Sequence, residues 1–89
     1  MEFDKFKETV APGDIIECVG GPEHLSHHIV VDTYTDDDGL YCCSCHTLYV
    51  QPPNCMEPGK LHYLYLEDFS ERNGENQVGI LYKHGNICH

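Results

Sequence analysis

Hydrophobic and polar residues alternate along this chain with two different periods, which predict a short helix followed by strands. Phe3, Phe6 and Val10 recur at helical spacing with charged residues between them, so a short amphipathic helix is expected over residues 2–9. Ala11-Pro12-Gly13 ends it. Segments rich in β-branched and aromatic residues, separated by turn signals, then predict five strands, over residues 14–19, 26–34, 40–50, 61–66 and 78–83.

These elements predict one compact domain over residues 1–89. The fold class is mainly β (small α+β): about five antiparallel strands in a curled sheet or small barrel, with the short N-terminal helix plugging one end. One helical turn is also expected near LEDFSE, residues 66–71. A chain of 89 residues buries only a marginal core, which small domains commonly reinforce with disulfides or a structural metal.

The run Asp36-Asp37-Asp38-Gly39 predicts a hairpin turn between the second and third strands. Closing the hairpin there pairs Thr35 with Leu40, Tyr34 with Tyr41, Asp32 with Cys43 and Val30 with Cys45. The hairpin then has two faces, and we expect the face that carries His27 and Ile29 to lie against the core. A one-residue slip would exchange the two faces. The first face holds His28, Val30, Asp32, Cys43, Cys45 and Thr47, and the second holds His27, Ile29, Val31, Cys42, Ser44, His46 and Leu48.

Residues 40–55 (LYCCSCHTLYVQPPNC) hold four of the six cysteines. The first ten residues are charged and do not resemble a signal peptide, so we expect a cytoplasmic, reducing location. Dense cysteines in that setting indicate metal binding, and Zn²⁺ is the default metal. Free thiols and disulfides are the alternatives.

The predicted zinc ligands are Cys42, Cys45, His46 and Cys55. Cys42 and Cys45 form a C-x-x-C pair, which needs a local turn, whereas the C-x-C pair Cys43 and Cys45 can share one strand face. A site closed by four protein ligands is structural rather than catalytic. The candidates for the fourth ligand are His46, Cys88, His89, Cys18 or His28. Cys42–His46 also matches the C-x-x-C-H haem pattern, with Met56 as a distal ligand, but the strand-like flanks argue against haem.

The charge is strongly acidic. Fifteen Asp and Glu face five Lys and Arg, a net charge of −10. This argues against direct nucleic-acid binding, which needs clustered basic residues, and no segment is long enough to span a membrane. The acidity predicts either a well-solvated surface or a protein partner with a basic surface. A homo-oligomer also remains open. The candidate partner surface is Asp36, Asp37, Asp38, Glu67, Asp68, Glu71 and Glu75, with exposed tyrosines such as Tyr63 or Tyr65, whose alternative role is core packing.

Two segments resemble the permuted NlpC/P60 papain-like hydrolases. Pro12-Gly13-Asp14-Ile15-Ile16 followed by SHHIVVD (residues 26–32) resembles the family's opening strands, and His27 would match its catalytic histidine. Tyr41-Cys42-Cys43-Ser44 resembles its cysteine motif, which would make Cys43 the nucleophile. The family carries that cysteine at the start of a helix, whereas a strand is expected here. The resemblance implies a thiol hydrolase as the alternative function.

In general profile, a short, strongly acidic, single-domain chain is similar to phage-encoded inhibitors of the anti-CRISPR type. Such proteins often occlude the nucleic-acid channel of a Cas9-type effector. This resemblance implies a non-enzymatic inhibitor that acts in the cytoplasm of a bacterial host and blocks nucleic-acid binding by its target. It assigns no interface residues. An interaction module unrelated to phage defence is the remaining alternative.

Overall fold

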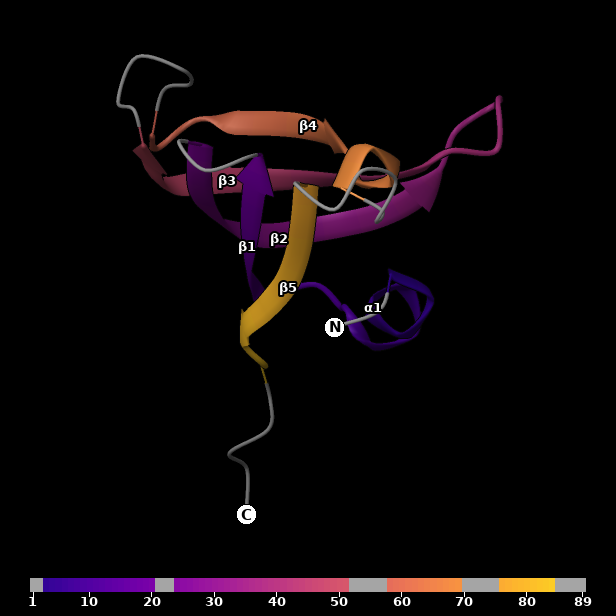
Figure 1. Cartoon of the computed structure of the whole chain (residues 1–89), viewed down its shortest axis with the longest axis horizontal. Helices are drawn as coiled ribbons and strands as arrows, with labels where there is room; N and C mark the ends of the chain where they lie inside the picture. Colours follow the sequence, from indigo (N-terminus) through magenta and orange to yellow (C-terminus); the bar gives the residue numbers. More distant parts are fainter. Residues whose placement is uncertain (1–2, 21–23, 52–57, 70–75, 85–89) are drawn as a thin grey trace.

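The computed structural model of the chain describes residues 3–20, 24–51, 58–69 and 76–84. Five antiparallel strands form one sheet in the order β4-β3-β2-β1-β5, with a short N-terminal helix beside it (Figure 1). The mainly β class is therefore confirmed. The elements are α1 (Phe3–Thr9), β1 (Ile15–Gly20), β2 (His24–Thr35), β3 (Tyr41–Gln51), β4 (Leu61–Tyr65), the 3-10 helix η1 (Leu66–Phe69) and β5 (Asn76–Tyr82).

The sheet is open, so the barrel alternative is wrong. β2 and β3 are long, with 12 and 11 residues, and the short strands pair with different parts of them. β1 pairs with residues 24–29 of β2, whereas β4 pairs with residues 42–46 of β3, which lie opposite residues 29–34 of β2. The edge strands β4 and β5 are therefore offset along the hairpin and are not paired with each other. Helix α1 consequently packs against one face of the sheet instead of plugging a barrel.

The β2–β3 hairpin is slipped by one residue near its turn. Tyr34 lies opposite Cys42, and Asp32 lies opposite Ser44. A bulge between Val30 and Asp32 then restores the predicted pairing of Val30 with Cys45. The predicted pairs that are wrong are Thr35 with Leu40, Tyr34 with Tyr41 and Asp32 with Cys43.

The turn itself forms where the sequence predicts it. The Asp36 Oδ1 atom accepts hydrogen bonds from the amides of Asp38 and Leu40, both at 2.9 Å. Gly39 adopts a φ of 83°, a conformation that glycine accepts without steric cost. The Asp36 side chain therefore holds the turn together.

The core lies on the face that was expected to be solvent-exposed, so the predicted orientation of the hairpin is wrong. Val30, Cys43 and Cys45 are at most 2% exposed and pack against Phe6 of α1 and Leu66 of η1. We call this side the inner face. The buried cluster is Phe6, Val10, Ile16, Cys18, Val30, Cys43, Cys45, Leu66 and Val78.

Polar residues of the inner face are buried and hydrogen-bonded to each other. The pattern of polar and apolar residues therefore predicted the wrong face as the core. His28 and Thr47 are both fully buried. The Nδ1 atom of His28 lies 2.9 Å from the Thr47 hydroxyl oxygen, and its Nε2 atom lies 2.7 Å from the Ser26 hydroxyl oxygen. Buried polar groups are tolerated when they are hydrogen-bonded. Asp32 leaves the inner face because the bulge turns it to the opposite, outer face, where it is exposed.

Asp14 joins the two ends of the described chain. Its carboxylate is fully buried and accepts hydrogen bonds from Lys83 Nζ at 2.7 Å and from the amides of Ala11 and His84, both at 2.8 Å. Gly13 precedes it with a φ of 93°, and a Cβ atom there would lie 2.7 Å from the His84 ring. The Gly13-Asp14 pair thus has a structural role.

Candidate functional site

In one region of the outer face, large side chains of β2 and β4 flank small side chains of β3, in rows that cross the three strands. In one row Cys42 lies between Tyr34 of β2 and Tyr65 of β4. In the next row Ser44 lies between Asp32 of β2 and Tyr63 of β4. Because residues directly opposite on paired strands share a face, both rows lie on the outer face. We call these six residues the tyrosine face: Asp32, Tyr34, Cys42, Ser44, Tyr63 and Tyr65.

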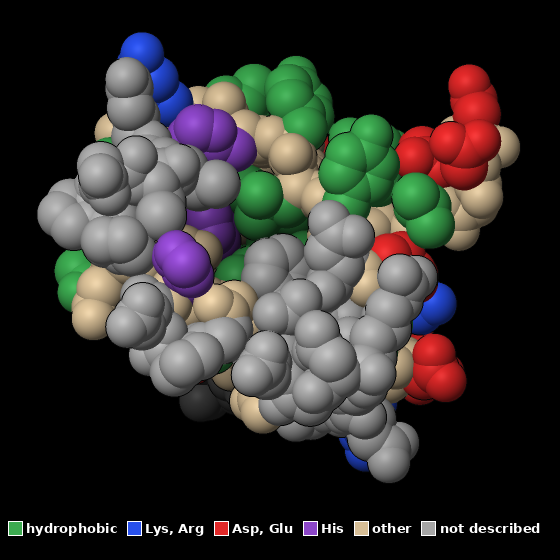
Figure 2. Space-filling view, turned by 45° about the horizontal axis from the view of Figure 1, so that its top comes forward, with side chains coloured by type: hydrophobic (Ala, Val, Ile, Leu, Met, Phe, Trp, Pro, Cys, Tyr) green, Lys and Arg blue, Asp and Glu red, His purple; other side chains and the backbone are tan. Residues whose placement is uncertain are grey.

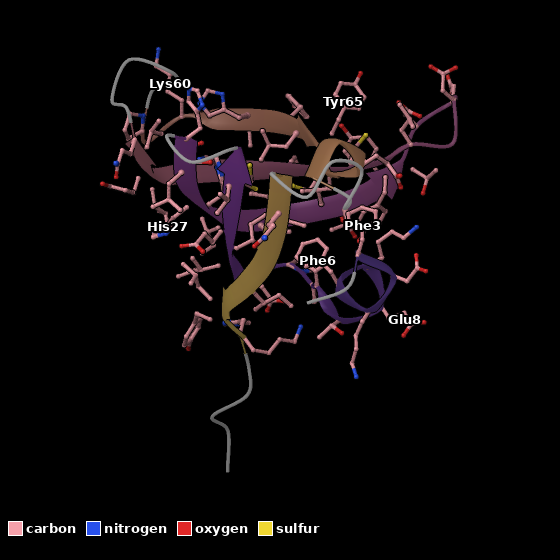
Figure 3. All side chains as sticks on the ribbon, in the orientation of Figure 1. Phe3, Phe6, Glu8, His27, Lys60 and Tyr65 are labelled. Carbon is pink, nitrogen blue, oxygen red and sulfur yellow. The ribbon has the colours of Figure 1, made fainter. Side chains whose placement is uncertain are left out.

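The tyrosines of this face are exposed, so they are not core residues. Tyr63 is 67% exposed, Tyr65 is 52% and Tyr34 is 40%, whereas Cys42 between them is only 2% exposed. Partial desolvation, followed by the nearby Cys42 thiol and Tyr65 hydroxyl, raises the pKa of Tyr34. Figure 3 shows Tyr65 projecting away from Phe3 and Phe6, on the other side of the sheet from α1. The result is an aromatic surface with a buried thiol beneath it.

Acidic residues lie at one end of the tyrosine face. Asp37 and Asp38 are exposed on the turn that follows β2, and Figure 2 shows acidic side chains at this end next to hydrophobic ones. Asp32 is also exposed and lies on the tyrosine face itself. Its Oδ1 atom accepts a hydrogen bond from the Thr33 amide at 2.9 Å, and its Oδ2 atom has no partner within the described ranges. The surface therefore combines aromatic rings with carboxylates.

Glu67, another acidic residue of the predicted partner surface, is not part of this arrangement. Glu67 of η1 is half-buried and lies 3.7 Å from Lys7 of α1, on the helix side of the sheet. Asp68 also belongs to η1. Glu71 and Glu75 lie outside the described residues. The structure brings together the turn aspartates and the tyrosines, and it adds Asp32, which the expected register had placed on the other face.

The predicted zinc ligands do not share one face of β3. Cys42 and His46 lie on the outer face, opposite Tyr65 and Leu61 of β4, whereas Cys45 lies on the inner face. A regular strand separates residues i and i+3 in this way, and the local turn that C-x-x-C needs is not present in β3. The remaining candidates Cys55, Cys88 and His89 lie outside the described residues.

The inner face instead gathers the C-x-C pair with further donors. Cys43 and Cys45 are fully buried, Cys18 is 2% exposed, and His28 is buried beside them. The hydrogen bond from Cys43, together with His28, lowers the pKa of Cys45 to about 5, and burial raises that of Cys18. Within the described residues, no three His, Cys, Asp or Glu side chains are arranged to hold a metal ion. The C-x-C spacing predicts that Cys43 and Cys45 share a strand face, and the structure confirms it.

The residues matched to the hydrolase family are also separated. His27 lies with Glu17 and Tyr49 on the outer face; its Nε2 atom is 3.0 Å from Glu17 Oε2, and its ring centroid is 5.5 Å from that of Tyr49. Cys43 is fully buried on the inner face, and the neighbouring Cys45 thiol and burial both raise its pKa. The structure does not bring His27 and Cys43 together.

Comparisons with known protein families, with characterised proteins and with solved structures find no match for this chain. No helix in the described part of the chain is long and apolar enough to cross a membrane. What the fold defines is a small β domain with one face of its sheet covered by α1 and η1 and the other carrying exposed tyrosines.

Proposed function

We propose that this chain is a protein-binding module that uses the tyrosine face and the adjacent acidic turn to bind a basic, nucleic-acid-handling protein. The observation that carries the proposal is the exposure of Tyr34, Tyr63 and Tyr65 next to Asp32 and the turn aspartates. Tyrosine combines apolar area with a polar tip and is enriched at binding interfaces.

Charge selects the kind of partner. The chain carries a net charge of −10, so a nucleic acid or another acidic surface would be repelled and a basic groove attracted. Electrostatic attraction of this kind accelerates association, and the aromatic area that the partner covers in the complex then slows dissociation. A basic groove that normally holds a nucleic-acid backbone meets both conditions.

The target we propose is a Cas9-type effector, and the consequence of binding is that its nucleic-acid channel is blocked. The support is the general profile of a short acidic domain, together with carboxylates that lie on the aromatic surface and at one end of it. The protein would then act by occupying the channel, without catalysis. In the part of the chain that the structure describes, His27 and Cys43 lie on opposite faces of the sheet, which does not support the hydrolase alternative.

A competition experiment tests this function. The full chain is added to a Cas9-type effector and its guide RNA, and binding of a fluorescent target DNA is followed by anisotropy. We expect the DNA to be displaced as the chain is titrated. Lysozyme, a basic protein without a nucleic-acid channel, serves as the control partner and should bind more weakly. No displacement, or equal binding to both proteins, would contradict the proposal.

A structural Zn²⁺ ion remains part of the proposal, with a changed set of protein ligands. Its support is the crowding of Cys18, Cys43, Cys45 and His28 on the inner face. Because these donors are not arranged around one point, an ion there would require side-chain rotation or a ligand from outside the described residues, such as Cys55. Cys42, on the outer face, would not take part.

A further inference from the structure

We propose that the tyrosine face is selective for arginine over lysine in the partner, with Asp32 and the rings of Tyr34 and Tyr65 as the recognition elements. This inference rests on the proposed function and names the chemistry by which it works. Three observations support it: the row that places two rings on either side of Cys42, the exposed carboxylate beside that row, and the acidic charge of the chain.

The rings are close enough to act on the same partner side chain. β2 and β4 are separated by β3 alone, so their backbones lie about 10 Å apart. The small Cys42 side chain lies opposite both Tyr34 and Tyr65 and is only 2% exposed, whereas the two longer side chains on either side of it are exposed. A planar cation placed over Cys42 would therefore contact aromatic surface from both strands.

The carboxylate completes the geometry. Asp32 precedes Tyr34 by two residues on the same face of β2, a separation of about 7 Å along the strand. The Asp32 Oδ2 atom has no partner in the part of the chain that the structure describes, whereas Oδ1 is engaged by the Thr33 amide. A donor group lying on the rings can therefore reach a free carboxylate oxygen.

A guanidinium fits this combination better than an ammonium group. The guanidinium is planar, so it can stack on aromatic rings. Its N–H groups lie in the same plane, so they can donate hydrogen bonds to a carboxylate while the guanidinium stays stacked on the rings. Lysine offers a compact, strongly hydrated charge, which gains from the carboxylate but little from the rings. The surface charge also disfavours a second copy of this chain as the occupant, because both copies would be acidic.

The test compares two peptides of equal charge, nona-arginine and nona-lysine, by titration against the full chain. We expect nona-arginine to bind about 10-fold more tightly, because a guanidinium stacks on the two rings whereas an ammonium gains little from them. Tyr65→Leu should reduce the ratio of the two dissociation constants to about 2-fold, whereas Tyr65→Phe, which keeps the ring, should retain it. Asp32→Asn should weaken binding of nona-arginine.

Matched controls lie elsewhere on the molecule. Tyr82 of β5 is 42% exposed at the opposite edge of the sheet, so Tyr82→Leu should leave the ratio unchanged. Glu8 is exposed on α1, on the other side of the sheet, and Glu8→Gln is the control for Asp32→Asn (Figure 3). Equal affinity for the two peptides, or a Tyr82→Leu effect as large as that of Tyr65→Leu, overturns the arginine inference but leaves binding of a basic partner intact. Absence of binding by either peptide overturns the inference and counts against the proposed function as well.

Discussion

The fully buried Asp14 carboxylate and the partly exposed Lys83 ammonium form an ion pair, 2.7 Å apart, between the segment after α1 and the end of β5. Burial alone would raise the pKa of Asp14, but the hydrogen bonds from Lys83 and from two backbone amides outweigh it and hold the pKa below its usual value of 3.8. A carboxyl group with a depressed pKa stabilises the fold at pH values above its unfolded pKa. Part of the stability is therefore expected to be lost as the pH falls below about 4.

Replacement of Asp14 tests this contribution. Asp14→Ala removes the carboxylate partner of Lys83, which keeps only its hydrogen bond to the Thr9 carbonyl oxygen, and leaves the amides of Ala11 and His84 without their acceptor. We therefore expect a loss of about 3 kcal/mol in the free energy of unfolding at pH 7. The difference between the variant and the wild type should shrink as the pH is lowered from 5 to 2. Urea unfolding across this range measures it, with the exposed Asp37→Asn as the control. A difference that does not depend on pH would show that the carboxylate charge is not responsible.

Phe6 is expected to be the most costly single truncation in the helix. It is fully buried, whereas Phe3, which stacks on it with ring centroids 6.1 Å apart, is only partly buried. Phe6→Ala should lower the free energy of unfolding by about 3–4 kcal/mol and Phe3→Ala by clearly less. Because small domains have little stability in reserve, the Phe6 variant should melt at a much lower temperature. Equal effects of the two changes would contradict the packing of α1.

The cysteines of β3 are expected to resist alkylation while the protein is folded. Cys42, Cys43 and Cys45 are at most 2% exposed, so iodoacetamide should label them slowly in native buffer and rapidly in urea. Peptide mass mapping assigns the label to each residue. Rapid native labelling of Cys43 that is suppressed in His27→Ala would instead favour the hydrolase alternative.

Metal analysis distinguishes the two faces of β3. If zinc is held by inner-face thiols, Cys45→Ser should reduce the bound zinc per chain strongly and Cys42→Ser should leave it nearly unchanged. Elemental analysis of protein purified under reducing conditions gives the stoichiometry, and unfolding with and without a chelator gives its effect on stability. An equal loss of zinc in both variants would favour the C-x-x-C pair as ligands. Wild-type protein that contains no metal, and whose unfolding is unchanged by EDTA, would contradict the zinc proposal.

The elements of this fold were predictable from local sequence, but the face that each strand buries was not. The helix at Phe3 and Phe6 and the turn at Gly39 depend on spacing and turn chemistry, which a sequence displays directly. The hairpin register depends on a bulge near Val31, which no residue type marks. One extra residue exchanges inward and outward positions on its strand, and Asp32 was assigned to the wrong face for that reason. The core face itself was chosen wrongly because His28 and Thr47, two polar residues, are buried on it in a hydrogen bond.

The candidate site was predictable only in part. The exposed tyrosines and the turn aspartates were identified from residue type, but Asp32 was placed on the wrong face by the expected register. The C-x-x-C motif suggested a ligand pair that a regular strand separates, whereas the adjacent C-x-C pair shares a face. The Asp14–Lys83 pair could not be foreseen, because its members are 69 residues apart and nothing local connects them.

The measurement that tests the central claim most directly is the association rate of the full chain with a Cas9-type effector, followed by biolayer interferometry at increasing salt. The account predicts that the wild-type rate falls at least 10-fold as salt is raised. Asp37→Asn with Asp38→Asn should slow association, Tyr65→Leu should mainly speed dissociation, and Tyr82→Leu should do neither. Neutralising Asp36 is avoided because its side chain holds the turn. Binding that is insensitive to salt and to both sets of changes, or no binding at all, would contradict the account.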